Sequence, residues 1–238
     1  MAADLGWGTG PHVFVDDLDR PELDDDDRHH LSRALRTRPG DPITISDGMG
    51  RWRPGRFGDP IEPDGAVVEV PRPEPAITVA VAPVKGARPE WAVQKLTELG
   101  VDAVWLLVAD RSVVRWDDER ADHHEDRLGR VARQAAMQSR SCWLPEIRVG
   151  VDFATAARTA GAAMAHHGGS APMLIRPVVL VGPEGGWSPT ELAAPIPAVG
   201  LGPTTLRTET AAVVVASLLV ALRSGLVCPV RGPATERG

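Results

Sequence analysis

The sequence predicts an α/β protein in which a small β-rich domain precedes a larger domain with a mostly parallel sheet. After residue 75, strand-like apolar runs alternate with helical patterns, an order typical of parallel strands covered by helices on both faces. The run 103–108 is apolar throughout, as buried parallel strands are. Between the two regions, alternating prolines at 71–75 predict a stiff, extended linker, so we divide the chain into residues 1–73 and 74–238.

The first region is expected to contain strands and one helix. Apolar runs bounded by turn residues predict strands at 12–15, 42–46 and 66–70. A helix is expected at 28–36, with Leu31 and Leu35 on one face, and the turn residues at 39–41 end it. The four aspartates at 24–27 precede this helix, where negative charge stabilises a helix N-terminus, and we assign them no function.

The second region begins with a β-branched strand at 77–82. A helix that starts at Pro89 carries an apolar stripe, and Gly100 is well placed as its C-cap. The apolar strand at 103–108 comes next. Helices are then expected at 117–138 and 152–160, and the glycines at 168–169 are expected to form a turn.

Two strand-loop-helix units occupy the last quarter of the chain. The first has a strand, a glycine-rich loop and a helix start with a capping box, at 178–181, 182–187 and 188–191. The second has a strand, a loop and a helix that is apolar on every side and therefore expected to be buried, at 198–201, 202–210 and 211–222. Both loops follow strands, at the edge where open α/β sheets bind ligands.

Composition narrows the class of protein further. The net charge of −6 argues against a protein that coats nucleic acid, although a local basic patch is compatible with it. Two cysteines without metal-ligand spacing suit a reducing compartment, and we expect a soluble, cytoplasmic protein with no membrane partner. Six of the seven histidines lie in adjacent pairs, whose side chains point apart, so no metal site is expected.

Two features have alternative interpretations from the residues alone. The glycine-rich loop at 182–186 is either a tight strand-to-helix turn or a place where a ligand approaches the main chain. Seven arginines between residues 28 and 56 form either a solvated charged face or a surface that binds phosphates.

Four motifs resemble one known family. GPEGGWSPTEL at 182–192 and LGPTTLRTETAAVVVASLL at 201–219 are similar to the paired signature of the ribosomal RNA small subunit methyltransferase E family, and 94–101 and 134–140 extend the match. This family belongs to the SPOUT superfamily of S-adenosylmethionine-dependent methyltransferases. The resemblance implies a PUA-like N-terminal barrel that helps to hold RNA, a C-terminal domain with a trefoil knot, and a homodimer. It implies methylation of a uridine N3 in 16S ribosomal RNA.

The resemblance also implies a set of site residues. The cofactor-binding residues would be His166, Gly182, Pro183, Glu184, Gly185, Gly186, Leu201, Gly202, Leu206, Arg207, Thr208 and Thr210. Uridine N3 must lose its proton before it attacks, so a base or a nearby cation is needed. Arg207 is the expected cation, while Glu209 and Glu184 are base candidates. Glu209 has a structural alternative, because an acid near a helix start stabilises the helix dipole.

RNA contacts are expected from two regions. The candidates are Arg28, Arg33, Arg36, Arg51 and Arg53 in the N-terminal domain, with Gln138 and Arg140 beside the active site or the dimer partner. His12, Met137 and Thr204 depart from the residues usual in the family, which weakens predictions of RNA contacts at these positions. Alternatives are a non-catalytic RNA-binding SPOUT-like protein, a methyltransferase acting on another RNA nucleotide, and an ordinary nucleotide-binding enzyme.

Overall fold

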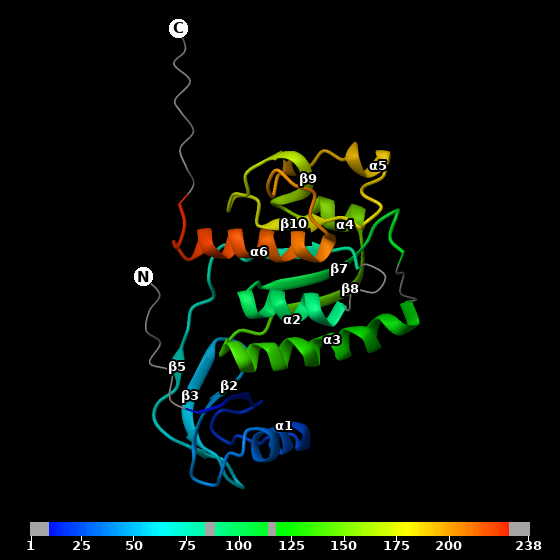
Figure 1. The fold of residues 1–238 in the computed structure, drawn as a ribbon. Coiled ribbons are helices and arrows are strands. Elements are labelled where there is room, and N and C mark those ends of the chain that lie inside the picture. The colour runs from blue at the N-terminus through cyan, green and yellow to red at the C-terminus, as the bar shows by residue number, and fades with distance from the viewer. Residues whose placement is uncertain (1–9, 84–88, 114–117, 229–238) are drawn as a thin grey trace.

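The computed structural model describes residues 10–83, 89–113 and 118–228, which form two packed units (Figure 1). The N-terminal unit is a five-stranded sheet with a short helical segment. Its strands are β1 (His12–Phe14), β2 (Pro42–Ser46), β3 (Arg51–Arg56), β4 (Glu62–Pro63) and β5 (Val68–Glu69). β1 and β2 are parallel, whereas β3 is antiparallel to β2, β4 and β5.

The helical segment of this unit differs from the prediction. It starts as α1 (Asp25–His29) and continues as a π-helical turn, η1 (His30–Ala34). Leu31 is buried as expected, but Leu35 is 45 % exposed. The wider π turn changes the angle between successive side chains, so a spacing of four residues no longer keeps both leucines on one face.

The C-terminal unit contains a six-stranded sheet of order β11-β9-β10-β6-β7-β8, and every adjacent pair is parallel. The strands are β6 (Thr78–Val81), β7 (Ala103–Val108), β8 (Glu146–Asp152), β9 (Ala162–Ser170), β10 (Val178–Val181) and β11 (Ala198–Val199). The prediction of a mostly parallel sheet is therefore confirmed.

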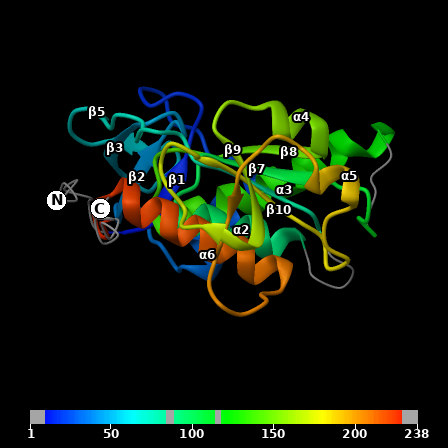
Figure 2. The same ribbon diagram turned by 90° about the horizontal axis from the view of Figure 1, so that it is seen from above.

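Helices cover both faces of this sheet, as Figures 1 and 2 show. One face packs against α2 (Pro89–Leu99), α3 (Asp118–Ser139) and α6 (Thr208–Arg223). The other face packs against α4 (Phe153–Arg158), and α5 (Pro189–Leu192) follows β10. Neighbouring residues of one strand serve opposite faces, so Val79 belongs to the first core and Ala80 to the second.

Two further expectations are wrong in part. The glycines at 168–169 do not form a turn but lie in β9, where a Cβ on Gly169 would lie 2.5 Å from the carbonyl carbon of Val199 in β11. Glycine is thus needed for close approach of two strands. The helix α6 buries one side only, and Leu218 on its other side is 36 % exposed, so apolar composition did not indicate burial all round.

The end of α3 joins the two units. Ala136 and Met137 are buried in the same core cluster as Phe14 of the N-terminal sheet. A β-bridge pairs Met49 with Trp143. Within the described ranges, no helix is long and apolar enough to cross a membrane, and no group of three or more metal-ligating side chains gathers in one place.

Candidate active site

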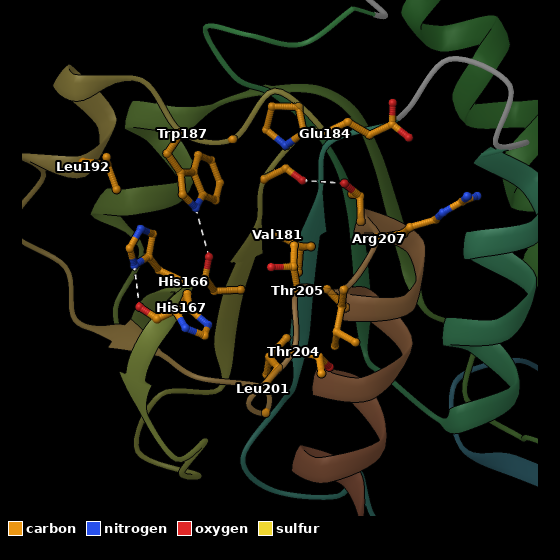
Figure 3. A pocket seen from close by; sticks show the side chains of 18 residues that line it. His166, His167, Val181, Glu184, Trp187, Leu192, Leu201, Thr204, Thr205 and Arg207 are labelled. Atoms are coloured by element: carbon orange, nitrogen blue, oxygen red, sulfur yellow. Dashed lines mark hydrogen bonds between the residues drawn. The ribbon is translucent and has the colours of Figure 1, made fainter.

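A cavity of about 610 Å³ lies at the carboxyl ends of three neighbouring strands, β11, β9 and β10. Its walls come from β9, the glycine-rich loop after β10, and the segment that joins β11 to α6 (Figure 3). The lining residues are Ala165, His166, His167, Val181, Gly182, Pro183, Glu184, Gly186, Trp187, Leu192, Leu201, Gly202, Thr204, Thr205, Leu206, Arg207, Thr208 and Ala211. Both loops singled out in the sequence therefore line one cavity.

A capped helix start holds the glycine-rich loop. The Ser188 hydroxyl accepts the Glu191 N–H at 3.2 Å, the Glu191 carboxylate accepts the Ser188 N–H at 2.7 Å, and Pro189 opens the helix, which confirms the predicted capping box. The other carboxylate oxygen of Glu191 accepts the N–H of Asp110 at 2.8 Å, and Glu191 is buried. This carboxylate thus ties the loop to the segment after β7.

The glycines of the cavity wall have different structural causes. Gly186 and Gly202 have φ angles of +69° and +136°, in the region that favours glycine, and a Cβ on either would meet no neighbouring atom. Gly182 has no such φ, but a Cβ there would lie 2.9 Å from the Trp187 ring. These loops consequently present main-chain groups to the cavity.

The start of α6 forms the opposite wall. Arg207 is the N-cap residue and is exposed, and its side chain makes no capping hydrogen bond. The Thr208 hydroxyl donates to the Gly182 carbonyl at 2.8 Å, which joins this wall to the glycine-rich loop. The positive end of the α6 dipole favours negative charge here. In Figure 3 the Arg207 side chain points away from His166 and His167.

Ten of the predicted cofactor-binding residues line the cavity, and three other site candidates do not. Gly185 belongs to the glycine-rich loop but does not line the cavity, and its carbonyl accepts a hydrogen bond from Nη1 of Arg111 at 2.9 Å. Thr210 is exposed on α6. Glu209 is half-buried, and its Oε2 has no hydrogen-bond partner among the described residues. The roles predicted for all of these residues, those that line the cavity included, stay predictions.

Several lining residues were not anticipated from the sequence. Ala165 and His167 belong to β9, a strand that the sequence analysis did not predict, and only His166 was placed near the cavity, through the family resemblance. Trp187 is the last residue of the loop 182–187 and lies within the family motif there, but it was given no role from the sequence. Thr205 lies inside the second loop motif but was not singled out, and Thr204 was named only as a departure from the residues usual in the family.

The candidate RNA contacts lie elsewhere, on the N-terminal unit and at the end of α3. Three of the arginines pair with acids: Arg28 with Asp59, Arg51 with Asp47, and Arg53 with Asp19. The Arg53 side chain is only 16 % exposed and also donates to the Gly65 carbonyl, so its position indicates a structural role. Arg33 and Arg36 are exposed and form no ion pair within the described ranges.

The two candidates at the end of α3 also differ from each other. Gln138 is exposed, whereas Arg140 donates a hydrogen bond to the Gly10 carbonyl. In Figure 1 the N-terminal unit and the cavity-bearing loops lie at opposite ends of the molecule. One chain therefore does not bring its candidate RNA contacts to its own cavity.

Comparisons with known proteins agree with this architecture. The model of an RNA methyltransferase domain matches residues 71–220, and that of an RNA methyltransferase PUA domain matches residues 23–70. A ribosomal RNA small subunit methyltransferase E from Mycobacterium bovis is 34 % identical over 81 % of this chain and 82 % of its own length.

Two solved structures share the fold. A methyltransferase from Legionella pneumophila with bound cofactor SAM is 26 % identical, with a TM-score of 0.76 over 90 % of this chain and 98 % of that one. A ribosomal RNA small subunit methyltransferase E from Neisseria gonorrhoeae bound to S-adenosyl methionine is 26 % identical, with a TM-score of 0.71 over the same shares of both chains. The chain belongs to the ribosomal RNA small subunit methyltransferase E family.

Proposed function

We propose that this protein is an S-adenosylmethionine-dependent methyltransferase that acts on N3 of a uridine in 16S ribosomal RNA in the cytoplasm. The observation that carries the proposal is that both family loops line a single cavity of about 610 Å³ at the carboxyl edge of the sheet. Membership of the family and the two S-adenosylmethionine-bound neighbours support the same reading.

The cavity fits the proposed cofactor. Its volume lies within the usual range of small-molecule sites, roughly 300–1,000 Å³. Apolar side chains of Val181, Leu201 and Leu206 suit a purine ring, and the main chain of 182–186 offers N–H and C=O groups. The positive end of α6 suits a carboxylate. When bound, S-adenosylmethionine supplies an electrophilic methyl group on a sulfonium.

The protein must help uridine N3 to lose its proton. Arg207 is one of the lining residues, and its guanidinium points away from His166 and His167 (Figure 3). Turned toward a bound uracil, this permanently charged group would stabilise negative charge spread over the uracil carbonyl oxygens. Glu184 lines the cavity and is exposed at its rim, so it is the better placed of the two base candidates. Glu209 does not line the cavity, and its buried Oε2 has no hydrogen-bond partner among the described residues, so it is the less well placed candidate.

We propose in addition that the active form is a homodimer. Because the N-terminal unit, which carries Arg33 and Arg36, and the cavity-bearing loops lie at opposite ends of the molecule (Figure 1), we expect the partner subunit to supply the RNA contacts beside each cavity. The exposed side of α6 around Leu218 offers apolar surface for such an association. The trefoil knot implied by the family stays a prediction.

Methylation of small ribosomal subunits in vitro tests the activity. Subunits from a strain that lacks this modification are incubated with S-adenosylmethionine carrying a labelled methyl group, and the product nucleoside is identified by mass spectrometry. We expect label on uridine N3 of 16S ribosomal RNA. Label on another base, on ribose, or on no RNA would refute the proposed reaction.

Mixing two inactive variants tests the shared site. Arg207→Ala damages the cavity, and Arg33→Glu with Arg36→Glu damages the RNA surface. If each site combines both chains, statistical heterodimers contain one intact site and recover about a quarter of the wild-type activity. If each chain is self-sufficient, the mixture stays inactive. Light scattering during gel filtration checks that dimers are present.

A further inference from the structure

The indole of Trp187 lies directly against the main chain of Gly182. A Cβ on Gly182 would lie 2.9 Å from Cε2 and 3.1 Å from Cδ2 and Cζ2 of that ring, which is closer than Cβ atoms normally approach. Trp187 is buried, and a neighbouring ring, Phe153, lies 5.5 Å away at 60°. Burial and the contact with Phe153 therefore restrict rotation of the indole away from Gly182.

Trp187 also connects two walls of the cavity. Its Nε1–H donates to the Ala165 carbonyl in β9 at 3.0 Å. Gly182, against which the ring packs, accepts the Thr208 hydroxyl of α6 through its own carbonyl at 2.8 Å. The contacts Ala165–Trp187–Gly182–Thr208 thus cross from β9 through the glycine-rich loop to α6, and Figure 3 shows both hydrogen bonds as dashed lines.

We propose that Trp187 is a positioning residue that sets the width of the cofactor cavity, and that residue 182 is glycine because the indole occupies the place of its side chain. This inference rests on the proposed function of the cavity as the S-adenosylmethionine site. It differs from the interpretation in which Gly182 is bare so that the cofactor can approach its main chain. The two explanations make opposite predictions for a compensating substitution.

The decisive experiment is a double-mutant cycle with Gly182→Ala and Trp187→Leu. The single change Gly182→Ala pushes the indole outward, so the melting temperature should fall and the dissociation constant of S-adenosylmethionine, measured by calorimetry, should rise about tenfold or more. Leucine lacks the ring atoms that a Cβ at position 182 would meet. In the double variant the added methyl group takes up part of the vacated space, and both quantities should recover toward those of Trp187→Leu alone.

Two matched phenylalanine variants separate positioning from general stability. Trp187→Phe keeps an aromatic ring but loses the N–H that reaches Ala165, so KM for S-adenosylmethionine should rise several-fold while kcat and KM for RNA change little. Trp105→Phe is the control, because Trp105 is buried in the same core cluster, does not line the cavity, and has an Nε1 without a hydrogen-bond partner among the described residues. It should leave the cofactor dissociation constant unchanged.

Each outcome decides one part of the inference. If adding Gly182→Ala to Trp187→Leu leaves the melting temperature unchanged but weakens cofactor binding as much as it does in the wild-type background, the glycine is needed by the cofactor and the proposal is overturned. If the two stability effects simply add, the packing argument is wrong. If the wild-type protein binds no S-adenosylmethionine, the proposed function fails, while the melting-temperature cycle still tests the Gly182–Trp187 contact independently.

Discussion

Acidification is expected to destabilise the protein through His12. This side chain is 3 % exposed in β1, its Nδ1 lies 2.9 Å from the Thr44 hydroxyl, and its Nε2 lies 3.2 Å from the Ser141 carbonyl. Because the carbonyl can only accept, Nε2 carries the proton and the neutral ring accepts at Nδ1. A second proton would have to be placed on Nδ1 of a buried ring, beside the Thr44 hydroxyl.

The size of the expected loss in unfolding free energy follows from the shift in the His12 pKa. Burial is the largest cause that lowers the pKa of His12 from 6.5 to about 4, and the positive charge of Arg140 lowers it further, against the raising effect of the Ser141 hydrogen bond. The unfolded chain therefore binds more protons than the folded chain between these two values, and stability falls as the pH falls through this window. The full difference corresponds to roughly 3 kcal/mol of unfolding free energy, at about 1.4 kcal/mol per pKa unit.

Urea unfolding at several pH values measures this effect. The wild type and His12→Asn are compared between pH 7.5 and pH 4, because asparagine keeps polar atoms near Thr44 but does not titrate in this range. Subtracting the two curves removes the contribution of the other titrating groups. The difference in unfolding free energy between the wild type and His12→Asn should shrink as the pH falls below 6.5. A difference curve that is flat across this range would refute the reasoning.

Three other perturbations have definite expected outcomes. Arg207→Ala should reduce methyl transfer by at least about a hundredfold while the S-adenosylmethionine dissociation constant, measured by calorimetry, stays within a few-fold. Reversing the charges of Arg33 and Arg36 should weaken RNA binding in a filter assay without changing cofactor affinity, because neither residue lines the cavity. The salt dependence of RNA binding should also fall, since each lost phosphate contact releases fewer counterions. Asp102→Ala should cost about 3–5 kcal/mol in urea unfolding, since it leaves the buried Arg223 guanidinium without its carboxylate partner, and truncating Arg223 as well should restore part of the loss.

The elements that could be predicted from the sequence are those determined by local interactions. The capping box at Ser188 needs only the spacing of serine, proline and glutamate, and it forms as expected. Gly100, with a φ of +85°, follows α2 as its C-cap position requires. The strand Ala103–Val108 is buried and apolar along nearly its whole length, so its pattern was unambiguous.

The elements that were not predicted depend on partners far away in the chain. β8 (Glu146–Asp152) was missed although Ile147, Val149 and Val151 alternate with more exposed residues, a pattern typical of a half-buried strand; β7 supplies its hydrogen bonds at one edge of the sheet. β9 passes through two glycines because β11 packs against one of them. The course of β9 through its glycines has no local signal in the sequence, whereas the alternation in β8 was available and was not used.

The same distinction applies to the cavity. The two loops were predicted because glycines, prolines and their family motif are local features. Trp187 and His167 were missed because their role depends on how far β9 extends beside β10. The glycines also illustrate why a motif alone leaves two interpretations open: Gly186 is required by its φ angle, whereas Gly182 is required by a neighbouring ring.

The junction between the two units constrains how RNA can reach the cavity. Separate domains usually move relative to one another unless their interface is large and apolar. Here Ala136 and Met137 of α3 complete the hydrophobic core around Phe14, and the Trp143 indole N–H donates to the Val70 carbonyl at 3.1 Å. A hinge at this position would expose the N-terminal core to water. The arginines of one chain therefore keep a fixed distance from their own cavity, so RNA bound to them is expected to reach a cavity that a second subunit brings alongside, rather than one reached by domain closure.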